Sequence, residues 1–167
     1  MSGTRWETPA AYTLKLEGVA RVGFRTLALA GVRDPVLIAE LDAYLDNVRT
    51  RVAQTYPPDG YRLLFHVYGR DGVMGTLEPV REVRSHELGL VIEVIAEDPD
   101  TSAAILALAR SVALHVTYPG RKAIAGNLAF PFSPSDLKAG DAYEFNVHHL
   151  VTVDDPLQLF PVEMVEV

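Results

Sequence analysis

Two Asp-Pro pairs constrain the fold of this chain more than any other feature, because each stands between a strand-like pattern and a helix-like pattern. They are Asp34-Pro35 and Asp98-Pro99. An aspartate side chain accepts hydrogen bonds from the free amides of a first helical turn, and proline fits that turn without losing a bond. After the first pair, apolar residues recur at helical spacing: Ile38, Leu41, Leu45, Val48 and Val52. Residues 101–116, after the second pair, are mostly Ala, Leu, Val and Ile. We expect a helix after each pair.

Four other segments have the pattern of β-strands. Residues 14–32 are rich in Val, Leu, Phe and Thr, with a bend or bulge expected near Gly23. Residues 61–68, 87–95 and 143–153 alternate between two kinds of side chain, which is typical of a strand with one buried face.

The order strand-helix-strand-strand-helix-strand predicts an α+β protein with the ferredoxin-like, split βαβ plan, βαββαβ. This plan has a four-stranded antiparallel sheet with two helices on one face, and here a long loop precedes the last strand. The strands would lie in the order fourth, first, third, second. We expect a flexible segment at 1–11, a single domain at 12–160 and a tail at 161–167.

Composition excludes several function classes. The chain contains no cysteine, which removes disulfides, thiolate metal sites and cysteine nucleophiles. Its formal net charge of −7 disfavours nucleic acid as a partner. No apolar run reaches the roughly 18 residues that a membrane span needs, so we expect no membrane insertion and a cytoplasmic protein.

The open face of the predicted sheet is the first candidate site. It would carry Arg25, Arg62, His66, Tyr68, Glu93, Glu144, Asn146 and His148. One interpretation is a set of cross-strand ion pairs, with Arg25 between Glu93 and Glu144; the other is a ligand or partner surface. His148 and His149 are adjacent strand residues with opposite directions, so they cannot share a metal, and we expect His149 in the interior. We predict no metal site and no cofactor.

A glycine-rich connection follows the strand at 61–68 and offers Tyr68, Arg70 and Asp71 as ligand-binding candidates. Such loops can point backbone amides at an anion. The string matches neither the phosphate-loop nor the dinucleotide-binding motif.

The long crossover at 118–136 carries the other local candidates. Arg121 and Lys122 would hold a carboxylate or phosphate, with Asn127 and Asp136 fixing polar groups beneath them. The alternative is an ordered cover without a ligand.

The helix at 101–116 has one charged residue, Arg110, and is apolar around its axis. A two-layer fold cannot bury every side of such a helix, so we expect the long loop, another copy or another chain to cover it. Ile105, Leu108 and Val112 are the interface candidates.

Nearly the whole chain, about residues 14–160, resembles the C-terminal, ferredoxin-fold region of the AtuA-like (acyclic terpene utilisation) family. The resemblance rests on five strings: Phe65–Gly75 (FHVYGRDGVMG), Tyr118–Lys122 (YPGRK), Gly126–Asp136 (GNLAFPFSPSD), Tyr143–Phe145 (YEF) and Val153–Pro156 (VDDP). It implies a bacterial cytoplasmic protein connected with the catabolism of branched isoprenoid acids through acyl-CoA thioesters. Family members generally have a much larger N-terminal domain, so we expect a freestanding small subunit or an excised domain.

Three functions follow as hypotheses. The first is an accessory subunit that assembles with itself and with a larger AtuA-like chain around an acyl-CoA or organic-acid ligand. The second is a small hydratase or isomerase, with Arg121 or Lys122 binding an anion and His148 or Asp136 moving a proton. The third is a small-ligand sensor, by analogy of fold alone.

Overall fold

The computed structural model describes residues 2–122, 127–155, 157 and 159–166. It divides into two compact units, Met1–Arg21 with Tyr143–Val167 and Val22–Ala142. Both units take residues from the domain expected at 12–160, whose unity remains a prediction.

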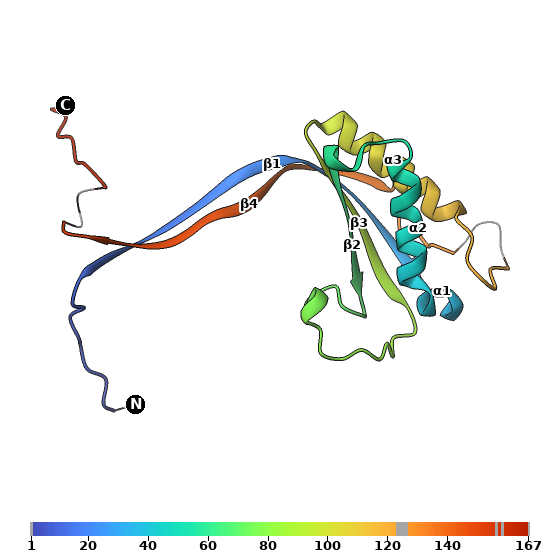
Figure 1. The fold of residues 1–167 in the computed structure, drawn as a ribbon, viewed down its shortest axis with the longest axis horizontal. Helices are drawn as coiled ribbons and strands as arrows, with labels where there is room; N and C mark the ends of the chain where they lie inside the picture. The colour runs from blue at the N-terminus through green and yellow to red at the C-terminus, as the bar shows by residue number, and fades with distance from the viewer. Residues whose placement is uncertain (1, 123–126, 156, 158, 167) are drawn as a thin grey trace. The chain divides into compact units, whose positions relative to one another are not determined.

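The described residues form an α+β structure with a four-stranded antiparallel sheet (Figure 1). Its elements are β1 (Tyr12–Val32), α1 (Pro35–Ala39), α2 (Leu41–Ala53), β2 (Tyr61–Tyr68), β3 (Leu88–Ala96), α3 (Pro99–His115) and β4 (Asp136–Val153). Short 3-10 turns cover Pro58–Gly60 and Gly75–Leu77. The strands are hydrogen-bonded in the order β2-β3-β1-β4. The α+β class and the antiparallel sheet are therefore confirmed.

Both Asp-Pro pairs start helices as predicted. The Asp34 carboxylate accepts a hydrogen bond from Val36 N at 2.9 Å. Asp98 Oδ1 accepts from the backbone nitrogens of Asp100 at 3.0 Å and Thr101 at 2.9 Å. The first helix is interrupted at Glu40, where φ is −104° and ψ is 15°, so α1 and α2 replace the single expected helix.

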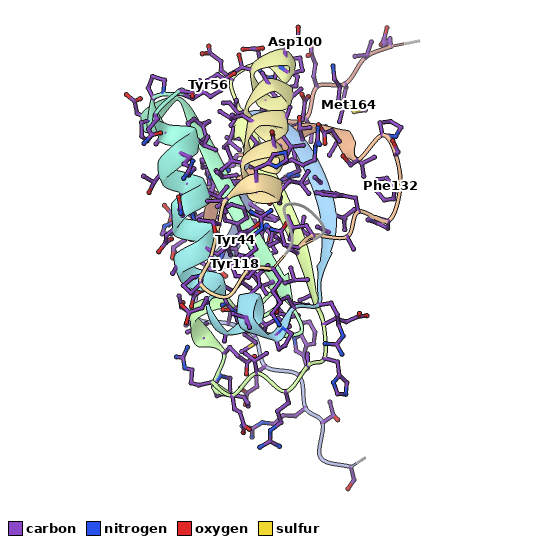
Figure 2. All side chains as sticks on the ribbon, turned by 90° about the vertical axis from the view of Figure 1, so that its right-hand side faces the viewer. Tyr44, Tyr56, Asp100, Tyr118, Phe132 and Met164 are labelled. Carbon is purple, nitrogen blue, oxygen red and sulfur yellow. The ribbon has the colours of Figure 1, made fainter. Side chains whose placement is uncertain are left out.

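Helices α2 and α3 pack side by side and cover one face of the sheet (Figures 1 and 2). The alternation predicted for the strands is confirmed there: Val67 of β2 and Leu90, Ile92 and Val94 of β3 are buried beneath the helices. Apolar residues of the helices complete this core, which lies in the unit Val22–Ala142.

Strand β1 has an unusual backbone conformation at Gly23, the position near which the sequence predicts a bend or bulge. Gly23 has a φ of +144°, which side-chain-bearing residues rarely adopt, and a Cβ there would lie 2.4 Å from the Ala96 carbonyl oxygen. Pairing of β1 with β3 begins at the next residue, Phe24, opposite Ala96.

The start of the last strand was placed too late by the sequence pattern. It begins at Asp136 rather than at Tyr143, directly after the crossover. Residues 136–142 include Lys138, Gly140 and Asp141 and show no clear alternation. Their strand conformation depends on pairing within the sheet, which local periodicity does not report.

Helix α3 is less available to a partner than its composition suggests. Ile105 is 1% exposed and lies in the core, which corrects its assignment as an interface residue. Leu108 and Val112 are half-buried and pack against the same core, so for them an interface remains a prediction. The outward positions hold the small or polar residues Ala104 and Ser111.

Replacing Ile105 with alanine should lower the free energy of unfolding by about 2–5 kcal/mol, because a buried side chain is lost and a cavity remains. Ala104→Ser, one residue earlier on the exposed side, should change it by less than about 0.5 kcal/mol. Urea denaturation followed by circular dichroism measures both. Similar effects for the two variants would contradict the placement of Ile105 in the core.

Candidate functional site

The glycine-rich loop after β2 closes on the end of its own strand. The backbone N–H groups of Arg70, Asp71 and Gly72 all donate to the Val67 carbonyl, at 3.3, 3.1 and 2.8 Å. A Cβ at Gly72 would lie 2.9 Å from Tyr68 N, so only glycine fits this approach without a shift. These amides are satisfied within the loop, which corrects the expectation that they face an anion.

The Arg70 side chain, rather than the backbone, gives this loop its positive charge. Its Nη1 donates to Asp42 on α2 at 2.8 Å, and its Nε donates to Asp71 at 3.2 Å. Burial lowers the pKa of Arg70, but the hydrogen bonds to Asp71 and Asp42 outweigh this and raise it. The guanidinium is thus a fixed cation held between the loop and the helix.

The sheet register brings more basic side chains to the same end of the sheet. Val32, the last residue of β1, pairs with Leu88, and Tyr68, the last residue of β2, pairs with Gly89. The chain therefore leaves β1, leaves β2 and enters β3 at one end of the sheet. Arg33, Arg70 and His86 all lie within two residues of these strand ends.

A cavity of about 510 Å³ lies among these segments, and we call it the arginine cavity. It is lined by Arg33, Pro35, Ile38, Ala39, Asp42, Arg70, Arg81, Val83, Ser85 and His86. Arg33 and Arg81 form no ion pair with any residue that the structure describes. Three guanidinium groups therefore share this cavity with one carboxylate, that of Asp42, which Arg70 already binds.

A second cavity, of about 290 Å³, has Arg70 and Arg81 in its wall as well, together with Asp71, Gly72 and Thr76. Arg70 and Asp71 thus lie together, as the sequence suggested. Tyr68 is exposed and lines neither cavity. Sequence reasoning missed Arg33, Arg81 and His86, because each is an isolated residue in a segment without a motif.

The candidate ligand-binding and catalytic residues of the crossover do not come together in one site. Residues 123–126 of the crossover lie outside the described residues. Arg121 donates to the carbonyls of Leu114, His115 and Val116 at 3.1, 2.8 and 2.9 Å. It therefore caps the C-terminal end of α3, which corrects its assignment as an anion-binding residue.

Asp136 is likewise engaged by the protein. Its Oδ1 accepts from Arg110 Nε at 2.6 Å, and its Oδ2 accepts from Arg110 Nη2 at 3.3 Å. Both carboxylate oxygens of Asp136 are thus engaged by Arg110, and a catalytic role for Asp136 stays a prediction.

Lys122 and Asn127 line a cavity of about 330 Å³ with Asp34 and Tyr118. Asn127 is 6% exposed, and its Nδ2 donates to Tyr44 Oη at 3.2 Å and to the Ala113 carbonyl at 3.1 Å. Its Oδ1 is buried and has no hydrogen-bond partner among the described residues. This acceptor is the feature of the crossover that best fits a ligand with a donor group.

Two tyrosines support this part of the site. The rings of Tyr44 and Tyr118 meet edge to face with centroids 6.1 Å apart (Figure 2). Tyr44 Oη donates to the Ala113 carbonyl, and Tyr118 Oη donates to Asp34 Oδ2 at 2.7 Å. Burial, followed by the Asp34 contact, raises the pKa of Tyr118 to about 12, and burial raises that of Tyr44. Both phenols stay protonated and act as donors.

A polar cluster of three strands lies on the sheet face opposite the helices. The Glu93 carboxylate of β3 accepts from Arg25 Nε of β1 at 2.6 Å and from His66 Nε2 of β2 at 2.6 Å. The predicted Arg25–Glu93 pair is confirmed; the burial of Glu93, which is 7% exposed, and its contact with His66 were not predicted. Burial raises the pKa of Glu93, but the hydrogen bonds from His66 and Arg25 outweigh this and lower it.

The Glu93 contact fixes the orientation of the His66 ring. An ionised carboxylate only accepts hydrogen bonds, so Nε2 donates and Nδ1 of the neutral ring is left as an acceptor. Nδ1 of His66 can therefore accept a hydrogen bond from a ligand while Glu93 holds the ring in place.

The histidines of β4 lie in the other unit. His148 is exposed, with Nε2 3.9 Å from Glu17 Oε1. His149 is also exposed, which corrects its expected place in the interior, because two strands without a covering layer have no interior. No group of three potential ligand side chains that could hold a metal occurs within the described part of the chain.

Comparison with known proteins finds no matching family model, curated protein or solved structure. Among the described residues, no helix combines the length and apolar character that crossing a membrane requires.

The Glu93 cluster predicts a pH-dependent contribution to stability. The pKa of Glu93 is lower in the folded state than its ordinary value of 4.5, so the stabilisation is present above that value and is lost as the pH falls through the folded pKa. Glu93→Gln should therefore lower the free energy of unfolding by about 1–2 kcal/mol at pH 7, with the difference shrinking in acid.

Urea denaturation at a series of pH values measures this difference. Glu97→Gln, which changes an exposed carboxylate just after β3, is the matched control and should have little effect. A loss that is equally large in acid would show that Glu93 contributes by packing rather than by its charge.

Proposed function

We propose that this chain is a binding subunit that takes an anionic organic ligand, an organic acid or an acyl-CoA thioester, in the arginine cavity. The convergence of Arg33, Arg70 and Arg81 on one cavity carries the proposal. The subunit assembles with itself and with a larger AtuA-like chain in the cytoplasm.

The chemistry of the cavity fits a carboxylate or a phosphate. A guanidinium presents paired donors that match two oxygens of either group. Arg70 is held in place by Asp42 and Asp71, whereas Arg33 and Arg81 have no carboxylate partner among the described residues. These two arginines are thus the groups that a ligand anion would neutralise.

The rest of the lining suits the carbon skeleton of such a ligand. Pro35, Ile38, Ala39 and Val83 supply apolar surface beside the guanidinium groups. A volume of about 510 Å³ lies within the usual range of about 300–1,000 Å³ for small-molecule sites. The adjoining cavity that shares Arg70 and Arg81 gives a longer ligand room beyond the first.

The AtuA-like identity rests on the sequence strings, and two structural facts support it. The strand order β2-β3-β1-β4 read from the other edge is the order of the split βαβ, ferredoxin-like plan. The string at residues 65–75 also supplies Arg70, Asp71 and Gly72 to the wall of the smaller cavity.

Co-purification of the tagged chain with an AtuA-like protein tests the larger partner. Recovery of the chain without such a protein would remove the larger partner from the proposal.

A second candidate function, a hydratase or isomerase reaction, is favoured by one observation. His66 is oriented by a buried carboxylate on the face where Leu64 and Leu29 are exposed, so a proton acceptor lies near apolar surface. If this function is correct, His66→Gln abolishes hydration of an unsaturated acyl-CoA, whereas His115→Gln, at an exposed residue of α3 outside both cavities, does not. Absence of turnover by the wild type with acyl-CoA substrates of several chain lengths would exclude it.

The binding function predicts that Arg33→Ala and Arg81→Ala each weaken the ligand at least about 10-fold, since each removes a charge-assisted hydrogen bond worth about 1.5–3 kcal/mol. Isothermal titration calorimetry with a branched acyl-CoA, its free acid and coenzyme A itself measures this and separates carboxylate from phosphate recognition.

Arg84→Ala is the matched control for this experiment. Arg84 belongs to the same loop, is exposed and pairs with Glu82, and it does not line the cavity. Equal losses for Arg81→Ala and Arg84→Ala, or no binding of any of the three compounds to the wild type, would contradict the proposal.

A further inference from the structure

The unit formed by the two ends of the chain contains a two-stranded antiparallel ribbon. Residues 12–21 of β1 lie beside residues 143–153 of β4. Their register follows from two contacts: Glu17 faces His148 at 3.9 Å, and a Cβ at Gly18 would lie 3.2 Å from Val147 Cβ. By strand alternation, Ala20 and Phe145 are the next pair on the Gly18–Val147 face.

This register places mostly apolar side chains on one face of the ribbon and mostly polar ones on the other. One face, which we call the apolar face, carries Leu14, Leu16, Gly18, Ala20, Phe145 and Val147, with His149 opposite Leu16. The other face carries Lys15, Glu17, Glu144, Asn146 and His148, together with the exposed Val19 and Leu150. A strand pair with this alternation is built to bury one side and to keep the other in water.

The described residues of this unit include no helix and no further strand that could cover the apolar face. Phe145 is 75% exposed and Tyr12, which shares the face by alternation, is 61% exposed. An isolated two-stranded hairpin is only marginally stable in water, and stability requires a further layer against its apolar side. The ribbon therefore needs a partner on this face.

We propose that the apolar face of the ribbon packs against the same face of a second copy of this chain. The proposal deepens the self-association included in the proposed function and names the surface that performs it. A half-turn about the long axis of the ribbon places β4 of one copy over β1 of the other. Phe145 then lies over Ala20 of the second copy, and Val147 lies over Gly18.

Size complementarity favours this occupant. Along the pair of strands, the small residues Gly18 and Ala20 are aligned with the larger Val147 and Phe145. The half-turn sets Val147 and Phe145 of each copy against Gly18 and Ala20 of the other, so the middle of the two faces can interlock as packed sheets do about 10 Å apart.

The exposed aromatic side chains also favour a pair. A buried Phe or Tyr removes about 150–250 Å² from water, so the exposed parts of Phe145 and Tyr12 alone contribute about 200–340 Å² per copy toward the roughly 800 Å² per partner that a stable interface buries. The opposite face is mostly polar, so a half-turn that pairs the apolar faces closes the association at two copies.

Sedimentation velocity between about 1 and about 100 µM tests the proposal on the full chain. The wild type should be a dimer at the upper concentrations. Phe145→Asp should be monomeric across the range, because it places a charge at the centre of the interface. Asn146→Asp, the neighbouring residue on the polar face, should dimerise like the wild type.

A size exchange tests the packing itself. Ala20→Phe should weaken dimerisation at least about 10-fold, because two large residues then meet, and Ala20→Phe with Phe145→Ala should restore it. This pair of variants also decides the case if Phe145→Asp does not fold, which circular dichroism would show.

Three outcomes would overturn the proposal. The first is a monomeric wild type, which would mean that the chain's own C-terminal residues or a different protein cover the face. The others are equal dimerisation of Phe145→Asp and the wild type, and loss of dimerisation in Asn146→Asp. Calorimetry on Phe145→Asp separates this proposal from the binding function, because the arginine cavity lies in the other unit. Lost dimerisation with retained ligand binding supports the interface whatever the identity of the ligand.

Discussion

The described fold depends most on the antiparallel pairing of β3 with both of its neighbours. Residues Leu88–Ala96 pair with β1 on one side and with β2 on the other. Alternate residues of β3, such as Leu90 and Ile92, enter the core under α2 and α3, while Glu93 points to the opposite face. A strand fixed at both edges cannot shift its register without exposing this core, so it determines where the connecting segments emerge.

Both candidate chemistries follow from that register. The end of β1, the end of β2 and the start of β3 meet at one end of the sheet, which gathers Arg33, Arg70 and His86 although they are far apart in the sequence. On the open face, the same pairing sets Arg25 and His66 on either side of Glu93. The first arrangement concentrates positive charge in a cavity, and the second orients an imidazole. The two arrangements adjoin, because His66 lines the smaller cavity together with Arg70 and Arg81.

Strand residues near the two ends of the chain also alternate between two faces, but there the apolar side chains stay exposed. In the unit Val22–Ala142, alternate strand residues are buried by two helices that follow the Asp-Pro pairs. In the ribbon, alternation separates mostly apolar from mostly polar side chains, but the described residues of this unit include no helix that covers the apolar side. The sequence predicted an uncovered apolar surface on α3. The structure instead has exposed apolar side chains on β1 and β4, among them Phe145.

The sequence by itself determined the features that depend on near neighbours along the chain. Asp34 and Asp98 cap helices because their carboxylates reach amides two or three residues away, and Leu90 and Val94 share a face because strand geometry repeats every two residues. Only the tertiary structure decided which polar groups meet. Arg121 binds the end of α3, Asp136 binds Arg110, and Arg81 enters the arginine cavity through contacts that no local pattern records. The early start of β4 at Asp136 has the same cause, since a strand with weak alternation is specified by its neighbours in the sheet.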